Sequence, residues 1–340
     1  MLSEQMKTHF RLYAWAVLGF HLAVVVWGAF VRASGSGAGC GERWPLCNGQ
    51  IVPTGPLTAT IIEFIHRLTS GVALVSVVVL VIWAYRVFPK RHGVRRGALL
   101  ALVCTIMECA IGAALVLLHM VAANASFSRG LWLAAHLMNT LFLLAALSVT
   151  AWLATTDDQP RFHYPKLQHL RQVIGLSTAE FVIAAILGGF AALGDTLVLS
   201  TSLTESIRAD FSPFSNIFVR LRILHPIVAA ALAVCLLVVA FRVTASSHTN
   251  AFAKRLSATM GVLVILQCGL GLANIALKTP TWLQLLHLLT ADLLWIAFVL
   301  LAVETLPRAC TSVFECAPLS QRLCDIGPRY EHATQKASGT

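Results

Sequence analysis

Residues 60–85 read TIIEFIHRLTSGVALVSVVVLVIWAY, and this stretch decides the class of fold. From residue 68 to residue 85 it carries no charged side chain. A helix needs about 20 mostly apolar residues to cross the hydrocarbon core of a bilayer. The stretch therefore predicts a membrane-spanning helix whose polar residues Glu63, His66 and Arg67 gather near one end.

The rest of the chain has the same character. Of its 340 residues 57% are hydrophobic and 12% are charged, whereas soluble domains have about 25% charged residues. This deficit excludes a soluble globular protein, a disordered chain and a nucleic-acid-binding domain, so the expected partner is the lipid bilayer and not nucleic acid. Apolar stretches of spanning length lie at about 12–32, 60–85, 98–119, 130–153, 172–193, 221–242, 257–277 and 282–304.

These stretches predict an all-α polytopic membrane protein with eight transmembrane helices, because backbone groups in lipid must be hydrogen-bonded internally. The first helix has no cleavage site after a short apolar core, so we expect it to stay as an anchor. Most of the 25 lysine and arginine residues lie on one side, in segments 7–11, 86–96, 161–171, 242–255 and 308–336. Basic loops stay in the cytoplasm, so both termini are expected there.

The two halves of the chain resemble each other. At a shift of about 159 or 151 residues the coinciding landmarks are Gly28-Ala29-Phe30 with Gly188-Gly189-Phe190, His66 with His225, Cys109 with Cys268, and His136 with His287. The repeat predicts two tandem four-helix bundles related by a pseudo-two-fold axis along the membrane normal. We expect units at 8–155 and 168–306, a cytoplasmic linker at 156–167 and a disordered cytoplasmic tail at 307–340.

Four histidines mark matching depths in the two units. His66 and His136 in the first, and His225 and His287 in the second, are expected 5–7 residues inside the outer ends of their helices. Two such rings facing each other suit an iron porphyrin ligated on both faces. Hydrogen bonds between helices are the alternative, and zinc is a weaker one, since two histidines fill half a tetrahedral shell. His21 has no counterpart and is interpreted as a core hydrogen bonder.

One difference separates the units. Glu63 stands three residues before His66, and the matching position before His225 is Arg222. A buried carboxyl one turn from an iron ligand can move protons or stabilise positive charge, while a salt bridge with Arg67 or Arg129 is the alternative. The first unit is therefore the expected reactive one, and the second an electron-transfer or structural haem site.

Cys40 and Cys47 lie in the first outer loop, where they form either a structural disulfide or a redox-active pair. The other cysteines are expected to be inert in the membrane (Cys104, Cys109, Cys235, Cys268) or reduced in the tail (Cys310, Cys316, Cys324). Glu108, Glu180 and Asp292 lie within helices, as proton relays or as buried hydrogen bonders.

Together these motifs resemble the haem A synthase family in its bacterial form, over about residues 10–305. The most specific parts are EFIHR at 63–67, GCGERWPLC at 39–47, and His136, His225 and His287. The resemblance implies that the first unit binds haem O and the second haem b. The implied roles are His66 and His136 ligating or flanking the haem O iron, His225 and His287 as axial ligands of haem b, Glu63 as catalytic carboxylate, and Cys40–Cys47 as disulfide.

The implied reaction oxidises the C8 methyl of haem O to a formyl group by successive hydroxylation, with oxygen from water, giving haem A for terminal oxidases. Haem O synthase is the implied substrate donor, with terminal oxidase assembly factors and an unidentified electron acceptor as further partners. The implied place is the bacterial inner membrane, with the haem sites near its outer face.

The chain departs from many bacterial members in one respect. Its outer segment 194–220 has no cysteine, so we expect no second disulfide there and a surface helix instead. Two other classes of protein remain, a cytochrome and a transporter, and a thiol oxidase is a third, less favoured class. A di-haem cytochrome that transfers electrons, for example from quinol, needs the four histidines but not Glu63. A transporter needs polar groups near mid-membrane, and a thiol oxidase needs more outer cysteines than one pair.

Overall fold

A computed structural model describes residues 2–54, 57–121, 124–156, 170–197, 203–246 and 249–305, and within these ranges it is helical and has no strand. The elements in chain order are α1 (Leu2–Ala33), η1 (Ser36–Ala38), α2 (Thr58–Val87), α3 (Gly93–Leu117), α4 (Phe127–Thr156), α5 (Leu170–Leu197), α6 (Leu203–Phe211), α7 (Ile217–Leu221), α8 (Leu224–Ala245), α9 (Ala251–Ala276) and α10 (Thr281–Thr305). Eight segments are long and apolar enough to cross a membrane, and they overlap all eight expected stretches.

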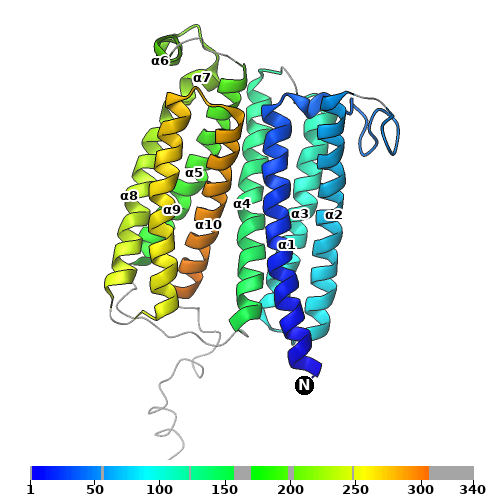
Figure 1. Ribbon diagram of the computed structural model, residues 1–340, viewed down its shortest axis with the longest axis vertical. Helices are drawn as coiled ribbons and strands as arrows, with labels where there is room; N and C mark the ends of the chain where they lie inside the picture. The colour runs from blue at the N-terminus through cyan, green and yellow to red at the C-terminus, as the bar shows by residue number, and fades with distance from the viewer. Residues whose placement is uncertain are drawn as a thin grey trace, which may run out of the picture. The chain divides into compact units, whose positions relative to one another are not determined.

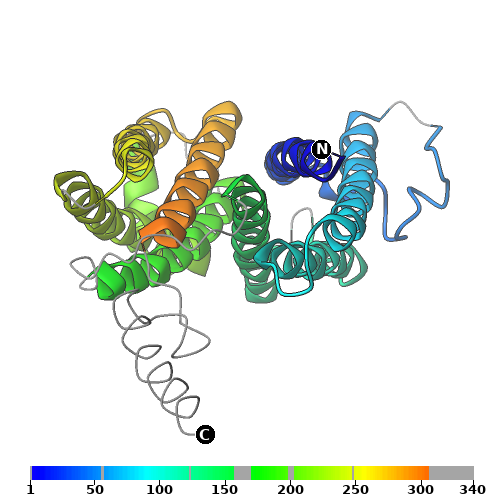
Figure 2. The same cartoon turned by 90° about the horizontal axis from the view of Figure 1, so that it is seen from below.

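The long helices form two groups of four that lie side by side (Figures 1 and 2). In the first group α1, α2, α3 and α4 contact one another in sequence, and α4 returns to α1. Helices α5, α8, α9 and α10 close a second ring in the same way. The all-α polytopic class is thereby confirmed, while the pseudo-two-fold relation and the unit boundaries stay predictions. Apart from Thr156, the predicted linker at 156–167 lies outside the described residues, as does the tail at 307–340.

Helices α4 and α10 are the most buried spans because they form the contact between the groups. Helix α4 contacts both α5 and α10, and α10 also contacts α1. The indole nitrogen of Trp295 on α10 donates to the carbonyl of Leu141 on α4 at 2.8 Å. A polar bond in such surroundings holds the register of the two helices, because a buried donor without a partner is costly.

The loop between α1 and α2, which is the predicted first outer loop, is tied to the start of α2. The Thr60 hydroxyl donates to the Gly39 carbonyl at 2.8 Å, and a Cβ at Gly39 would collide with the Ala59 backbone, so only glycine fits. Cys40 and Cys47 form a disulfide within the loop, which confirms the expected pair. Both cysteines are buried.

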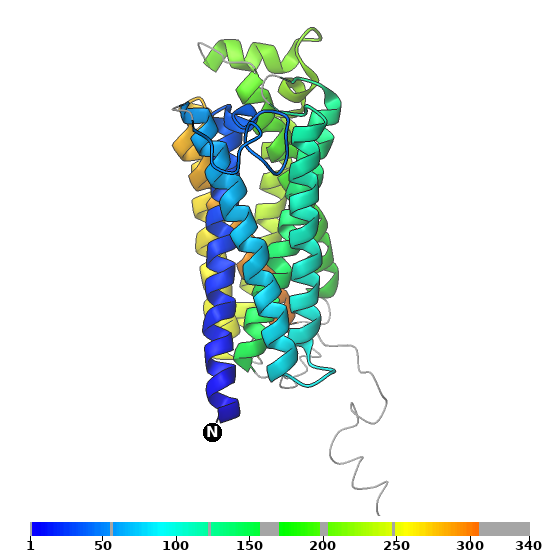
Figure 3. The ribbon, with the colours of Figure 1, turned by 90° about the vertical axis from the view of Figure 1, so that its right-hand side faces the viewer.

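The second large outer loop contains α6, which lies at the same end of the molecule as the first outer loop (Figure 3). Glu205 lies in the first turn of this helix and Arg208 in its last turn, and Phe211 is exposed. The expected surface helix is thereby confirmed.

A break separates α7 from α8 at residues 222–223. Pro226 explains it, because a proline ring clashes with the carbonyl four residues earlier, here that of Arg222, and is tolerated only in the first turn of a helix. His225 consequently stands next to the first residue of α8.

Candidate haem site

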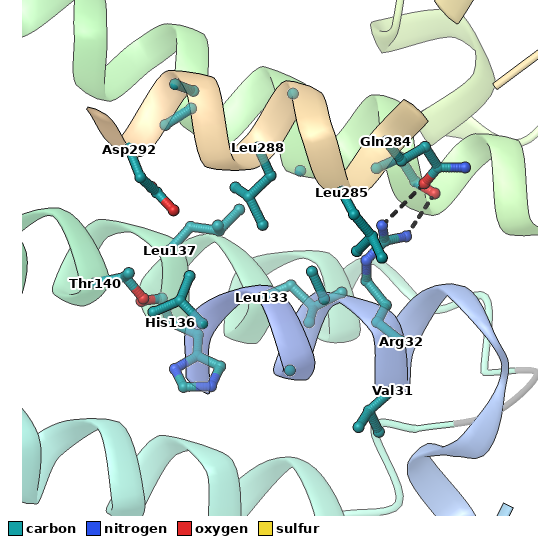
Figure 4. A pocket seen from close by; sticks show the side chains of 18 of the residues that line it. Val31, Arg32, Leu133, His136, Leu137, Thr140, Gln284, Leu285, Leu288 and Asp292 are labelled. Atoms are coloured by element: carbon teal, nitrogen blue, oxygen red, sulfur yellow. Dashed lines mark hydrogen bonds between the residues drawn. The ribbon is translucent and has the colours of Figure 1, made fainter. Parts of the chain in front are cut away.

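One cavity of about 1570 Å³ reaches through both four-helix groups. Single ligand pockets measure about 300–1,000 Å³, so this one has room for more than one large ligand. Its lining is mainly leucine, valine, alanine and glycine, and all four predicted histidines take part in it. Figure 4 shows the part between the groups, where Leu133 and Leu137 of α4 face Leu285 and Leu288 of α10.

The histidines of the second unit face each other. The ring centroids of His225 and His287 are 6.4 Å apart, and the ring planes are inclined by 84°. A metal–imidazole bond is about 2 Å long, so two rings on opposite sides of one iron have centroids roughly 6 Å apart. Nδ1 of His225 bonds to the Ala184 carbonyl at 3.0 Å, which leaves Nε2 for a metal. This donor set fits a haem with two axial imidazoles.

Glycines on neighbouring helices make room for these rings. An added Cβ at Gly28 would lie 2.8 Å from Cε1 of His66, and one at Gly188 would lie 3.0 Å from Cε1 of His225. The two contacts are equivalent in the repeat, because Gly28 matches Gly188 and His66 matches His225. In each unit, a glycine on the first helix (α1 or α5) thus allows that helix to pack against the histidine ring of the second helix (α2 or α8).

In the first unit, His66 and His136 line the same cavity and are close enough to interact electrostatically. Nδ1 of His66 is buried and has no hydrogen-bond partner. Nδ1 of His136 forms an ion pair with Glu108 of α3. In Figure 4 the His136 ring extends away from Asp292 of α10. The two rings thus suit a second iron porphyrin, and each keeps a nitrogen available for it.

Glu63 lines the cavity and is almost fully buried. Its Oε2 accepts from the backbone N–H of Cys40 at 2.8 Å, and its Oε1 accepts from Nε and Nη2 of Arg67 at 3.1 and 2.5 Å. The salt bridge considered for Glu63 is therefore present, with Arg67 as partner. Arg129, the other partner considered, donates to the Asn124 carbonyl instead.

Arg222, which matches Glu63 in the repeat, binds residues of the second outer loop. It forms ion pairs with Asp195 of α5 and Asp210 of α6. Its Nη2 also donates to the Ser206 carbonyl at 2.8 Å and to the Ser206 hydroxyl. The matching positions thus each bind an outer loop, with charges of opposite sign.

The expected depth of the histidines is wrong in part. His66 and His136 lie eight and nine residues beyond the first residues of their helices, Thr58 and Phe127. His287 lies six residues into α10, as expected, and His225 only one residue into α8. The differences arise because α2 and α4 begin earlier than hydropathy indicates, and because Pro226 starts a new helix at residue 224.

The sequence did not identify Arg32 and Gln267 as residues of the site, and it did not predict which residue Glu108 contacts. Arg32 of α1 donates to the Ala192 carbonyl of α5 at 2.9 Å and to Oε1 of Gln284 on α10 at 3.1 Å (Figure 4). Glu108 contacts His136, and its counterpart Gln267 lies 3.3 Å from Nε2 of His287. The same shift that pairs Cys109 with Cys268 pairs Glu108 with Gln267, so the repeat held this signal.

The other residues singled out in the sequence are His21, buried Asp292 and the cysteines outside the disulfide. Nδ1 of His21 bonds to the Val17 carbonyl at 2.8 Å, as expected of a core hydrogen bonder. Oδ2 of buried Asp292 has no hydrogen-bond partner and lies at the cavity. Free thiols in the described ranges are Cys104, Cys109, Cys235 and Cys268; the tail cysteines lie outside those ranges. Within the same ranges no group of three or more metal-binding side chains occurs.

The chain is similar in sequence to several known proteins. The chain is 42% identical over 301 residues to a protoheme IX farnesyltransferase of Thermus thermophilus, covering 88% of the chain and 49% of that relative. It is 33% identical over 146 residues to the heme A synthase of Alkalihalophilus pseudofirmus, covering 43% and 46% of the two chains. The heme A synthase of Geobacillus kaustophilus is 40% identical over 111 residues, 33% of this chain and 35% of its own.

The chain thus spans about half the length of these relatives or less. The model of a single family extends much further along the chain, over residues 11–299. This range includes all eight spans except the ends of the first and last. The chain belongs to the COX15-CtaA family of cytochrome oxidase assembly proteins.

Proposed function

We propose that this chain is a haem A synthase, which oxidises the C8 methyl of haem O to a formyl group. One observation carries the proposal: two histidine pairs line one cavity, and only the pair of the first unit is accompanied by the carboxylates Glu63 and Glu108. The heme A synthases among the relatives and the family membership support it. The farnesyltransferase name belongs to a relative about half of which lies outside the match, so that name is not transferred.

The second unit would hold haem b between His225 and His287. The bond from His225 Nδ1 to the Ala184 carbonyl keeps the ring turned and Nε2 free. When bound, haem b would supply a relay for single electrons between the substrate and an external acceptor. The mainly apolar lining of the cavity suits the apolar faces of the macrocycle.

The first unit would bind haem O through His66 and His136. Conversion of a methyl group and one water into a formyl group releases four electrons and four protons, so the site needs a proton acceptor beside the substrate. Glu63 is the carboxylate for this task, because it lies at the cavity wall one turn from His66. Arg67 and the Cys40 N–H fix both of its oxygens in place. The same carboxylate can stabilise positive charge that develops on the methyl carbon.

The partners follow from the chemistry of the substrate. Haem O is a farnesylated haem, so its donor would be haem O synthase, and the long farnesyltransferase relative supports such a link. Terminal oxidase assembly factors would receive haem A, and a further partner would accept the electrons. The predicted topology puts both termini in the cytoplasm and the haem sites near the outer face of the inner membrane.

The alternative is a di-haem cytochrome that only transfers electrons. The facing rings of His225 and His287 favour it, since this arrangement is typical of electron-transfer haems. It leaves the carboxylates at the first pair without a task, so Glu63 distinguishes the two proposals.

The test is chromatography of haems extracted from membranes that contain this chain together with a haem O synthase. Wild type is expected to accumulate haem A, whereas Glu63→Gln keeps both haem sites and loses at least nine-tenths of the product, since a positioned acid or base contributes about 10²–10⁴-fold. Glu42→Gln, an exposed glutamate in the loop that Glu63 contacts, is the matched control. Haem-loaded wild type that yields only haem b and haem O would favour the electron carrier.

A further inference from the structure

Glu108 is held by two residues of the neighbouring helix. Its Oε1 accepts from the Thr140 hydroxyl at 2.9 Å, and its other oxygen pairs with Nδ1 of His136. Thr140 and His136 are one turn apart on α4, and the Thr140 hydroxyl is also 3.0 Å from the His136 carbonyl. The carboxylate therefore joins α3 to α4 at the point where the His136 ring meets the cavity.

The surroundings of Glu108 are rich in imidazoles. Besides His136, the rings of His21 on α1 and His66 on α2 are close enough to interact electrostatically with Glu108. Glu108 thus lies among histidines from three helices, α1, α2 and α4. A carboxyl side chain at this place distinguishes the first unit from the second, where Gln267 stands.

The second unit differs at each matching position. Gln267 replaces the carboxylate with a neutral amide, and it contacts Nε2 of His287 at 3.3 Å and not Nδ1. Ala291 replaces Thr140, so no hydroxyl fixes the amide. Nδ1 of His287 is buried without a hydrogen-bond partner. Of the two matching histidines His136 and His287, only His136 thus has a side-chain partner on Nδ1 that leaves Nε2 for a metal.

The contact has a known physical effect on a metal-binding imidazole. A carboxylate that accepts from one ring nitrogen fixes the tautomer, orients the ring and raises the basicity of the other nitrogen. Loss of such a partner lowers metal affinity or activity by about 10–100-fold. Hydrogen bonding at a haem ligand also changes the reduction potential of the iron.

We propose that Glu108 is the positioning residue of His136, and that the exchange of glutamate for glutamine between the two units sets their haem irons apart in affinity and potential. The proposal rests on the proposed function in one respect, that His136 ligates the iron of the haem in the first unit. Thr140 fixes the carboxylate, and the carboxylate fixes the ring. Glu108 itself need not touch the reacting methyl group.

The test measures release of haem from the purified, haem-loaded protein to excess apomyoglobin, which gives one phase for each site. The phase lost in His136→Ala belongs to the first unit. Glu108→Gln installs the side chain of the second unit and is expected to accelerate that phase about 10–100-fold. Thr140→Val, which keeps the charge but removes its hydrogen bond, is expected to accelerate it less. Gln267→Glu is the reciprocal variant and should change only the other phase.

Redox titration of the same samples provides a readout that a purely structural role would not change. Loss of the carboxylate is expected to raise the midpoint potential of one haem and leave the other unchanged, because the ligand becomes less electron-rich. If Glu108→Gln leaves the first phase and both potentials unchanged, or shifts both sites equally, the proposal is wrong. These readouts need no turnover, so a failure of haem A formation in wild type would overturn the proposed function alone.

Discussion

Single glycines determine how closely the helices approach the histidines. At Gly28 and Gly188 the absent side chain is the space that the His66 and His225 rings fill. An added Cβ at Gly271 would lie 3.4 Å from Cε1 of His287, and one at Gly112 would have no neighbour within 4 Å. His136 has instead a charged partner in Glu108. The histidine rings are thus oriented in two ways, by close packing against a glycine or by a charged hydrogen-bond partner.

Gly28→Ala is expected to displace the His66 ring, because the new Cβ would lie 2.8 Å from its Cε1. Overpacking costs about 1–3 kcal/mol, and 1.4 kcal/mol is tenfold in binding, so haem retention in the first unit should fall about tenfold. The measurement is the ratio of haem to protein together with the phases of haem release. Gly19→Ala, on the same helix with open space around it and outside the cavity lining, is the control and should lose no haem. Equal retention in the two variants would contradict the packing argument.

At the scale of elements, each outer loop is bound to the start of the helix that carries a histidine. In the first unit the disulfide, the Thr60 hydroxyl and the Glu63 carboxylate bind the loop to α2. In the second unit Arg222 bonds to α5 and α6 without any disulfide. In the second unit, partly buried ion pairs therefore hold the loop where the first unit has a disulfide.

Arg222→Met is expected to release α6 from the end of α8. Hydrogen bonds to charged groups contribute about 1.5–3 kcal/mol each, and Arg222 makes several to Asp195, Asp210 and Ser206. Tryptic cleavage after Arg208 within α6 should accelerate at least tenfold, measured by mass spectrometry of timed digests. Arg220→Met, a change of an exposed arginine two residues earlier, is the control. Indistinguishable cleavage rates would show that α6 is held by other contacts.

Sequence could predict the spans and the histidines but not every partner. Long apolar runs specify spanning helices by themselves, and the repeat identified His66, His136, His225 and His287 as a set. The contact of Glu108 with His136 depends on how α3 and α4 are rotated about their axes, which side-chain packing decides and hydropathy does not. The start of α8 followed from Pro226, whose effect depends on a helix boundary that a continuous apolar run hides.

At the scale of the whole molecule, a partly buried cation joins the two four-helix groups. The side chain of Arg32 extends from α1 of the first group and donates hydrogen bonds to α5 and α10 of the second. It lines the common cavity, as do the residues of α4 and α10 that pack between the groups. The groups therefore share polar as well as apolar contacts, and we expect them to unfold together.

Arg32→Gln is expected to weaken this junction, because the shorter neutral side chain cannot span from α1 to the Ala192 carbonyl and Gln284. The loss of charged hydrogen bonds should cost about 2–4 kcal/mol and lower the unfolding temperature by several degrees. Thermal unfolding of haem-loaded protein in detergent, followed by tryptophan fluorescence, measures it. Arg86→Gln at the exposed end of α2 is the control. The same midpoint for both variants would mean that α4 and α10 alone hold the groups together.

The size of the shared cavity has a consequence for the life of the protein in the cell. A large apolar ligand gives the lining side chains dispersion contacts on every side, and any ligand that binds only the folded chain stabilises it by mass action. The amount of folded protein in the membrane then follows the supply of porphyrin as well as the rate of translation. A shortage of iron would thus deplete the protein itself, through proteolysis of its unfolded form.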